Sequence, residues 1–208
     1  MEEKIINAVK EALEGGKRNF KESVELAVNL KDIDLSNPKN RIDLELALPK
    51  GRGKDIKVAL FGAGELAVKA KPYTRVISPE ELDKLSDKKA AKALAEEYDF
   101  FLADASLMPT IGKKLGTVLG PRGKMPKPIS PLADPVAIVN NLKSTVRIKS
   151  KESKTLHVPV GTKDMSSEDL AENIETVLKK LEESLERGKL NIGSVYVKTT
   201  MGKSVRIV

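Results

Sequence analysis

The sequence predicts a protein of mixed α/β and α+β class with two domains, one of them discontinuous. Near both ends of the chain, apolar and polar residues alternate with a period of two, which is typical of strands with one buried face. The middle contains continuous apolar runs that alternate with helical segments, which is typical of a parallel sheet covered on both faces. Each terminal fragment has only about fifty residues, a marginal size for an independent core. We therefore expect residues 1–53 and 151–208 to form one two-layer α+β domain, with residues 54–150 inserted as a Rossmann-like three-layer α/β domain.

The terminal domain is expected to place two helices on one antiparallel sheet. The first helix is predicted over residues 2–13, because its apolar residues share one face. The second begins at Ser166 or Ser167, whose hydroxyls suit the N-cap position, and ends before Gly188. Alternating residues predict strands over residues 20–30, 41–49, 155–161, 194–200 and 203–208, and the last two form a hairpin around Met201 and Gly202.

The inserted domain is predicted to alternate strands and helices. Strands are expected over residues 56–61, 74–78, 98–105 and 144–149, and helices over residues 64–71, 78–97 and 135–142, while residues 107–119 are expected to be helical or turn-like. The helix over residues 78–97 should break near Ser86. This order implies a mainly parallel sheet, since parallel neighbours need helical crossovers.

The composition excludes several classes of function. The 208 residues include no Cys and one His, so disulfides, thiolate metal sites and histidine-rich metal centres are not expected, and no cofactor is predicted. The first residues are acidic and helical, and no apolar run approaches the roughly eighteen residues that a membrane span needs. We expect a cytoplasmic protein with no membrane partner.

The charge favours an anionic partner, because the net charge is +7 and the pI is about 9.4. Residues 54–150 carry 17 Lys and Arg against 11 Asp and Glu, whereas the remainder carries 20 against 19. The middle of the chain is therefore predicted to be the basic part. Only 3% of the residues are aromatic, too few for the stacking platforms that bind single strands, so folded RNA is the expected nucleic-acid partner.

The stretch GTVLGPRGKMPKPIS, residues 116–130, combines basic residues with prolines and glycines. Its prolines restrict the backbone, its glycines permit tight turns, and Arg122, Lys124 and Lys127 provide positive charge. We interpret it as a rigid loop that, with Lys114, makes secondary phosphate contacts. The alternative is a flexible, solvated basic loop.

Another motif, Gly62-x-Gly64-x-x-Ala67, lies between a predicted strand and a predicted helix, as in dinucleotide-binding fingerprints. Such a fingerprint needs an acidic residue at the end of the next strand to bind the ribose, yet that strand ends in Ser78. We favour a tight strand-to-helix turn, and a nucleotide-binding α/β enzyme is the alternative function.

Two long motifs occur in the chain: GTVLGPRGKMPKP at residues 116–128 and SVYVKTTMGKSVRI at residues 194–207. Both resemble hallmarks of the L-one family of large-subunit ribosomal proteins. The resemblance covers essentially the whole chain, including RNFKESVELAVNLKDIDL at residues 18–35. The short N-terminus and the connection at residues 49–67 resemble archaeal members.

The resemblance implies a non-enzymatic protein of the large ribosomal subunit that binds ribosomal RNA and forms the mobile side stalk near the tRNA exit site. It also implies contact with exit-site tRNA and repression of translation through the protein's own messenger RNA. In this family the discontinuous terminal domain contains most of the specific RNA site, and the inserted domain moves relative to it. We expect a monomer when the protein is free. A generic basic interaction module is a third interpretation.

The resemblance also implies which residues contact RNA, in the strands and last hairpin of the terminal domain. These are Phe20, Ser23, Glu25, His157, Ser194, Thr200, Met201 and Gly202. A Thr hydroxyl can donate to and accept from ribose 2′-OH groups, Met offers a deformable apolar surface, and Gly allows the RNA backbone to approach. The sequence departs from the family at Asn19, where bacterial members usually have Lys, so that phosphate contact is not carried over.

Overall fold

The computed structural model describes residues 2–15, 18–37, 40–85, 87–130, 134–150 and 153–208. The chain divides into two compact units, Met1–Lys54 with Ser144–Val208, and Asp55–Lys143. We call them the terminal unit and the inserted unit. The first contains antiparallel sheets and the second a parallel sheet, so the predicted mixed fold class is confirmed.

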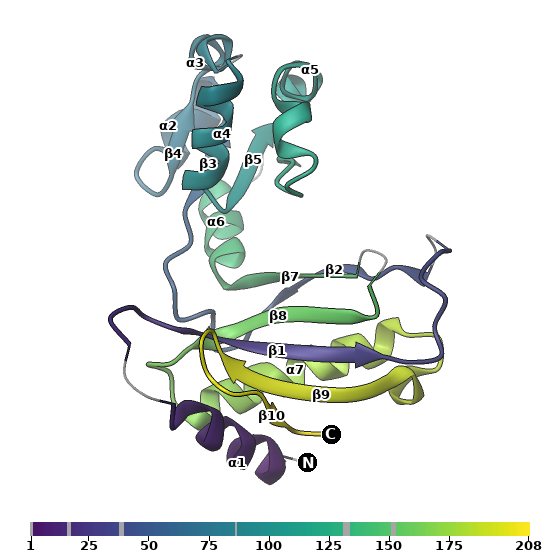
Figure 1. Cartoon of the computed structure of the whole chain (residues 1–208). Helices are drawn as coiled ribbons and strands as arrows, with labels where there is room; N and C mark the ends of the chain where they lie inside the picture. Colours follow the sequence, from purple (N-terminus) through teal and green to yellow (C-terminus); the bar gives the residue numbers. More distant parts are fainter. Residues whose placement is uncertain (1, 16–17, 38–39, 86, 131–133, 151–152) are drawn as a thin grey trace. The chain divides into compact units, whose positions relative to one another are not determined.

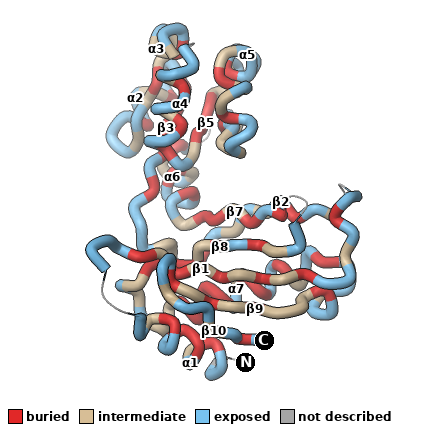
Figure 2. The backbone as a smooth tube through the Cα atoms, viewed as in Figure 1, coloured by how far each residue is buried: buried red, intermediate tan, exposed pale blue. Residues whose placement is uncertain are grey.

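The main sheet of the terminal unit has four antiparallel strands in the order β10-β9-β1-β8 (Figure 1). The strands are β1 (Ser23–Leu30), β8 (Thr155–Thr162), β9 (Ile192–Thr199) and β10 (Val205–Arg206). Along β1, buried and partly exposed residues alternate, as Figure 2 shows. The two helices α1 (Glu2–Leu13) and α7 (Ser167–Ser184) contribute to the core on the buried face. The other face carries most of the polar residues of these strands, and no helix formed by the described residues of this unit shares a core with it; we call it the open face.

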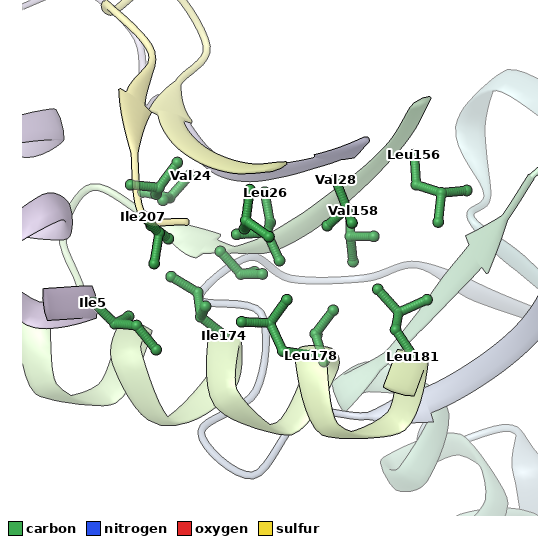
Figure 3. Close-up of a cluster of buried hydrophobic side chains, with 14 of the residues drawn as sticks. Ile5, Val24, Leu26, Val28, Leu156, Val158, Ile174, Leu178, Leu181 and Ile207 are labelled. Carbon is green, nitrogen blue, oxygen red and sulfur yellow. The ribbon is translucent and has the colours of Figure 1, made fainter. Parts of the chain in front are cut away.

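The core between β1 and α7 consists of aliphatic side chains. In Figure 3, Val24, Leu26 and Val28 of β1 point toward Ile174 and Leu178 of α7. All five belong to one buried cluster. Burial of each such side chain stabilises the fold by about 1.5–3 kcal/mol, so a slip of β1 by one residue, which would turn this set outward, is strongly disfavoured.

The first crossover between the units is fastened to the terminal unit by Asn173, a fully buried residue of α7. Its side-chain oxygen accepts from the Lys50 amide at 3.1 Å, and its amide group donates to Gly51 O at 3.0 Å and Val160 O at 2.9 Å. Because its side-chain oxygen and its side-chain amide group both form hydrogen bonds, Asn173 holds residues 50–51 against β8.

One strand lies elsewhere than predicted. We expected residues 144–149 in the parallel sheet, but β7 (Thr145–Lys149) pairs antiparallel with β2 (Asp43–Ala47) in a separate two-stranded sheet. Apolar residues of the two strands lie opposite each other, and Arg147 Nε and Nη2 donate to the two Asp43 carboxylate oxygens, each at 2.8 Å. Matching period-two patterns and opposite charges explain this pairing. The single antiparallel sheet predicted for the termini is thus two sheets.

The position of β7 also changes the charge distribution. The terminal unit carries 23 Lys and Arg against 19 Asp and Glu, and the inserted unit carries 14 against 11. Their net charges are therefore +4 and +3. The excess of positive charge counted over residues 54–150 is thus shared between the two units, because Lys54, Arg147 and Lys149 belong to the terminal unit.

The inserted unit contains a parallel four-stranded sheet in the order β4-β3-β5-β6. The strands are β3 (Val58–Phe61), β4 (Arg75–Ile77), β5 (Phe100–Asp104) and β6 (Lys127–Ile129). One core cluster joins Phe61 and Phe101 to helices α3 (Pro79–Lys84), α4 (Lys88–Glu97) and α5 (Met108–Leu119). A second joins Leu60 and Leu102 to helices α2 (Gly64–Ala70) and α6 (Pro135–Ser144). Neighbouring residues of a strand point to opposite faces, so the sheet has helices on both sides, as predicted.

Two details of the inserted unit concern the predicted elements. Helices α3 and α4 lie on either side of the break expected near Ser86, which itself is outside the described residues. Residues 127–129, interpreted as loop, instead form the edge strand β6, because an edge position tolerates the missing amide hydrogen of Pro128.

Among the described residues, no helix is both long and apolar enough to cross a bilayer.

Candidate nucleic-acid interface

The eight residues expected to bind RNA lie on the open face or at one end of the main sheet. Ser23 and Glu25 are odd-numbered residues of β1, and the register pairs Ala27 with His157 and Asn29 with Ser194. Side chains of paired residues point to the same face, so four of the predicted residues share the open face. The other four flank the start of β1 and the end of β9, which are adjacent because the strands are antiparallel.

A row of hydrogen-bonded polar side chains crosses the open face. Asn29 Nδ2 donates to Ser194 Oγ at 2.9 Å, and Thr155 Oγ1 donates to Asn29 Oδ1 at 2.9 Å. The row holds Ser194, one of the predicted contacts, in a fixed position. Asn29 and Thr155 were not among the predicted site residues; the signal was their polar character at open-face positions of neighbouring strands.

Thr200 is held against the first residue of β1. Its hydroxyl oxygen accepts a hydrogen bond from the Ser23 amide at 3.1 Å and donates to Ser23 O at 3.3 Å. The hydroxyl therefore retains one acceptor position for a ligand. Thr200 thus joins the end of β9 to the start of β1, and its hydroxyl oxygen can also contact a ligand directly.

Two large apolar side chains are exposed at this end of the sheet. Met201 is 62% exposed and Phe20 is 53% exposed. Next to Met201, a side chain at Gly202 would bring its Cβ within 2.3 Å of Thr199 Oγ1. A side chain at position 202 would therefore force the buried Thr199 to shift, so glycine suits this turn.

Glu22 is part of this arrangement and was missed. It is only 3% exposed, and its Oε1 accepts from the Met201 amide at 3.0 Å while Oε2 lies 3.6 Å from Lys163 Nζ. The Met201 amide, and after it the Lys163 ammonium, hold the pKa of the Glu22 carboxyl below its ordinary value although burial opposes them. The signal in the sequence was a carboxylate at an even-numbered position, in phase with the buried residues of β1.

A hollow of about 490 Å³ adjoins the turn and is lined by both signs of charge. Its lining includes Glu22, Met201 and Gly202 from the arrangement above, with Arg18 and Lys203 as the basic side chains. The predicted site thus borders a concave surface as well as the open face.

Three of the four predicted phosphate-contacting residues of the inserted unit, Lys114, Arg122 and Lys124, interact with its own helices. Lys124 Nζ donates to Ala95 O and Tyr98 O, both at 2.8 Å, at the C-terminal end of α4. Arg122 Nη2 donates to Glu96 Oε1 at 3.1 Å, and Lys114 forms an ion pair with Asp83. Lys127 lies in β6. The contacts of Arg122 and Lys124 hold the loop against α4, which favours a fixed rather than a flexible loop. Phosphate contact by the four residues stays a prediction.

The Gly62–Gly64 motif forms the turn between β3 and α2. Gly64 has a φ of 62°, which favours glycine, and α2 has only seven residues. After the next strand, Ser78 Oγ accepts from the Glu81 amide at 3.2 Å and caps α3. Ser78 therefore has a structural role, and the acid that would bind a ribose is absent from the end of β4, a described strand.

Comparisons with known proteins agree with the motifs. The sequence pattern of the Ribosomal protein L1p/L10e family matches residues 9–203. Among curated proteins, the chain is similar to the large ribosomal subunit protein uL1 of Methanocella arvoryzae, with 53% identity over 207 residues, 98% of this chain and 97% of the relative. The uL1 proteins of Picrophilus torridus and Methanothrix thermoacetophila are each 52% identical, over 97% and 100% of this chain and 94% and 100% of the relatives.

Proposed function

The chain belongs to the Ribosomal protein L1p/L10e family, and from that premise we propose that the open face and the adjoining Thr200–Gly202 turn bind folded large-subunit ribosomal RNA. The observation that carries the proposal is the gathering of the eight expected residues at one face and end of a single sheet, with Met201 exposed beside them. Hydroxyl groups there suit ribose 2′-OH groups, and the apolar side chain suits a base or sugar face.

As a uL1-type component of the large ribosomal subunit, the protein is a structural protein and not an enzyme. The nucleotide-binding enzyme considered as the alternative is therefore rejected, in keeping with the structural roles of Gly64 and Ser78 in their turns. The third interpretation, a generic basic interaction module, is rejected as well, because a component of the large ribosomal subunit has a specific class of partner, ribosomal RNA.

Beyond this, we infer that the protein forms the mobile side stalk near the tRNA exit site and contacts tRNA there. We also infer that it represses translation by binding its own messenger RNA at a mimic of the ribosomal site. Family membership supports both inferences. The same face would bind the ribosomal RNA and the messenger RNA, since a messenger that copies the folded shape of the ribosomal site offers the same shape and 2′-OH contacts.

The main test is filter binding of the whole protein to fragments of large-subunit ribosomal RNA, beside a thermal-shift screen with NAD and nucleotides. We expect tight, specific binding of one stalk fragment, weak binding of unrelated RNA, and no shift with nucleotides. A nucleotide-dependent shift without specific RNA binding would overturn the proposal.

The inference of repression has its own test. A reporter that carries the leader of the protein's own messenger RNA should be translated less as the protein is added, and a reporter without that leader should not. Equal translation of both reporters would contradict repression while leaving ribosomal RNA binding intact.

A further inference from the structure

We propose that Glu22 is a positioning residue for the RNA site: its buried carboxylate holds the Met201 amide and so fixes the turn that presents Met201 and Gly202 to RNA. The inference rests on the proposed function, because it concerns how the same surface is prepared for binding. Glu22 itself is almost inaccessible, so it acts through the turn and not by touching RNA.

The hydrogen bonds of the turn single out this carboxylate. The Thr200 amide donates to Ser23 O at 3.0 Å and the Gly202 amide donates to Thr199 O at 3.1 Å, so both use backbone acceptors. The amide between them, that of Met201, donates to the Glu22 side chain at 3.0 Å. Of these three consecutive amides, the Met201 amide is therefore the one whose anchor a substitution can remove.

Glu22 also connects the turn to a third segment. Its backbone carbonyl accepts from the Lys163 amide at 3.0 Å, and its Oε2 lies 3.6 Å from Lys163 Nζ, which in turn donates to Gly15 O at 2.6 Å. One residue thus ties the start of β1, the segment after β8 and the turn after β9 together. A carboxylate in a buried position is costly unless it is paired and hydrogen-bonded, and Glu22 meets both conditions.

The benefit for binding is preorganisation. Met201 has most of its side chain in solvent, so packing of that side chain does not by itself fix the turn. A turn that is ordered only on contact with RNA would lose affinity through the entropy of ordering. With the Met201 amide already anchored, this cost is removed before RNA arrives.

The test compares three substitutions that separate the acceptor, the charge and the reach of Glu22. Glu22→Gln keeps an oxygen acceptor, Glu22→Met keeps the length without an acceptor, and Glu22→Asp keeps the charge but is one methylene shorter. We expect Glu22→Gln to bind the stalk RNA fragment within about threefold of the native protein, and Glu22→Met and Glu22→Asp to bind about tenfold more weakly. The salt dependence should not change, since Glu22 meets no phosphate.

A structural readout accompanies the titration. Amide hydrogen exchange followed by NMR should show faster exchange at Met201 in Glu22→Met and Glu22→Asp, and unchanged exchange at Leu26 and Val28 in the centre of the sheet. Glu175→Met is the matched control, because Glu175 is an exposed residue of α7, outside the proposed site. It should change neither Met201 exchange nor affinity.

The outcomes are distinct. Unchanged Met201 exchange in both variants, or faster exchange with native affinity, would overturn the positioning role. If Glu22→Met does not fold, Glu22→Asp decides the question in the same way. Failure of the native protein to bind any ribosomal RNA fragment would instead refute the proposed function, and this inference with it.

Discussion

Thr200 and Ser23 close the end of the β1–β9 ladder through three hydrogen bonds. The Thr200 amide donates to Ser23 O at 3.0 Å, its hydroxyl donates to the same oxygen at 3.3 Å, and its Oγ1 accepts from the Ser23 amide at 3.1 Å. A residue expected to touch RNA therefore also aligns the two strands that carry the other expected contacts. Substitutions at Thr200 should affect both stability and binding.

We predict that Thr200→Val lowers the free energy of unfolding by about 1 kcal/mol, since the backbone groups of Ser23 lose a side-chain partner. It should also weaken specific RNA binding by roughly 1–3 kcal/mol without changing the salt dependence. Urea unfolding and filter binding measure the two effects. Thr110→Val, at an exposed position of α5, is the control; native stability and affinity in Thr200→Val would contradict the prediction.

Met201→Ala should separate binding from stability. Because the side chain is 62% exposed, its loss should leave the melting temperature nearly unchanged while weakening RNA binding by roughly 1–3 kcal/mol. Val68→Ala, which trims a 73% exposed apolar side chain of α2 in the inserted unit, should not reduce specific affinity. Equal losses in the two variants would show that Met201 has no special role.

The inserted unit should be removable. We predict that deleting residues 55–143 and joining Lys54 to Ser144 by a short Gly/Ser linker yields a folded protein that keeps most of the specific RNA affinity. Deleting residues 54–150 should give a less stable protein, since it removes β7 and leaves β2 without its partner strand. Circular dichroism and RNA titration compare the two; loss of nearly all specific binding in the first, folded variant would exclude the terminal unit as the main site.

Replacing Arg122, Lys124 and Lys127 with Gln should lower RNA affinity and reduce the slope of log K against log salt by up to about three, if each meets a phosphate. Discrimination between cognate and unrelated RNA should persist. Titrations need both a stalk RNA fragment and protein-depleted large subunits. An unchanged slope with both targets would restrict these residues to a structural role.

A single substitution controls for that structural role. Lys124→Gln removes an ammonium group that donates to two carbonyls at the end of α4, so it should lower the stability of the protein by about 1–2 kcal/mol. The triple variant contains this substitution and should be destabilised too. Its RNA affinity must therefore be measured at a temperature at which circular dichroism shows the variant to be folded.

The stability conferred by Glu22 should depend on pH. The Met201 amide and the Lys163 ammonium hold the pKa of Glu22 below 4.5 in the folded protein, so the ionised carboxylate stabilises the fold above that pH. The contribution is lost as pH falls through the folded value. We predict that the native protein is more stable than Glu22→Gln near neutral pH and that the difference shrinks as pH falls through and below the pKa of Glu22. Denaturant unfolding across this range measures it, and a pH-independent difference would contradict the assignment.

Several features followed from the sequence because they depend on local patterns. The alternation of Val24, Leu26 and Val28 predicted a strand with one buried face, and the apolar stripe that includes Ile174 predicted the helix that covers it. The hairpin around Met201 and Gly202 was also predicted correctly. Periodicity and turn residues act over a few positions, so they can be recognised without knowing what packs against them.

Other features depended on pairs of residues that are distant in the chain, and only the tertiary structure decided them. The pattern of residues 145–149 suits either sheet, and its pairing with β2 requires contacts such as Arg147 with Asp43, over a hundred positions apart. The anchoring of Met201 by Glu22 joins positions 179 apart, and Lys124 binds carbonyls of a helix that ends before the predicted loop begins. A charged side chain in a sequence has many possible partners, and its actual partner is decided when packing brings the segments together and excludes water from between them.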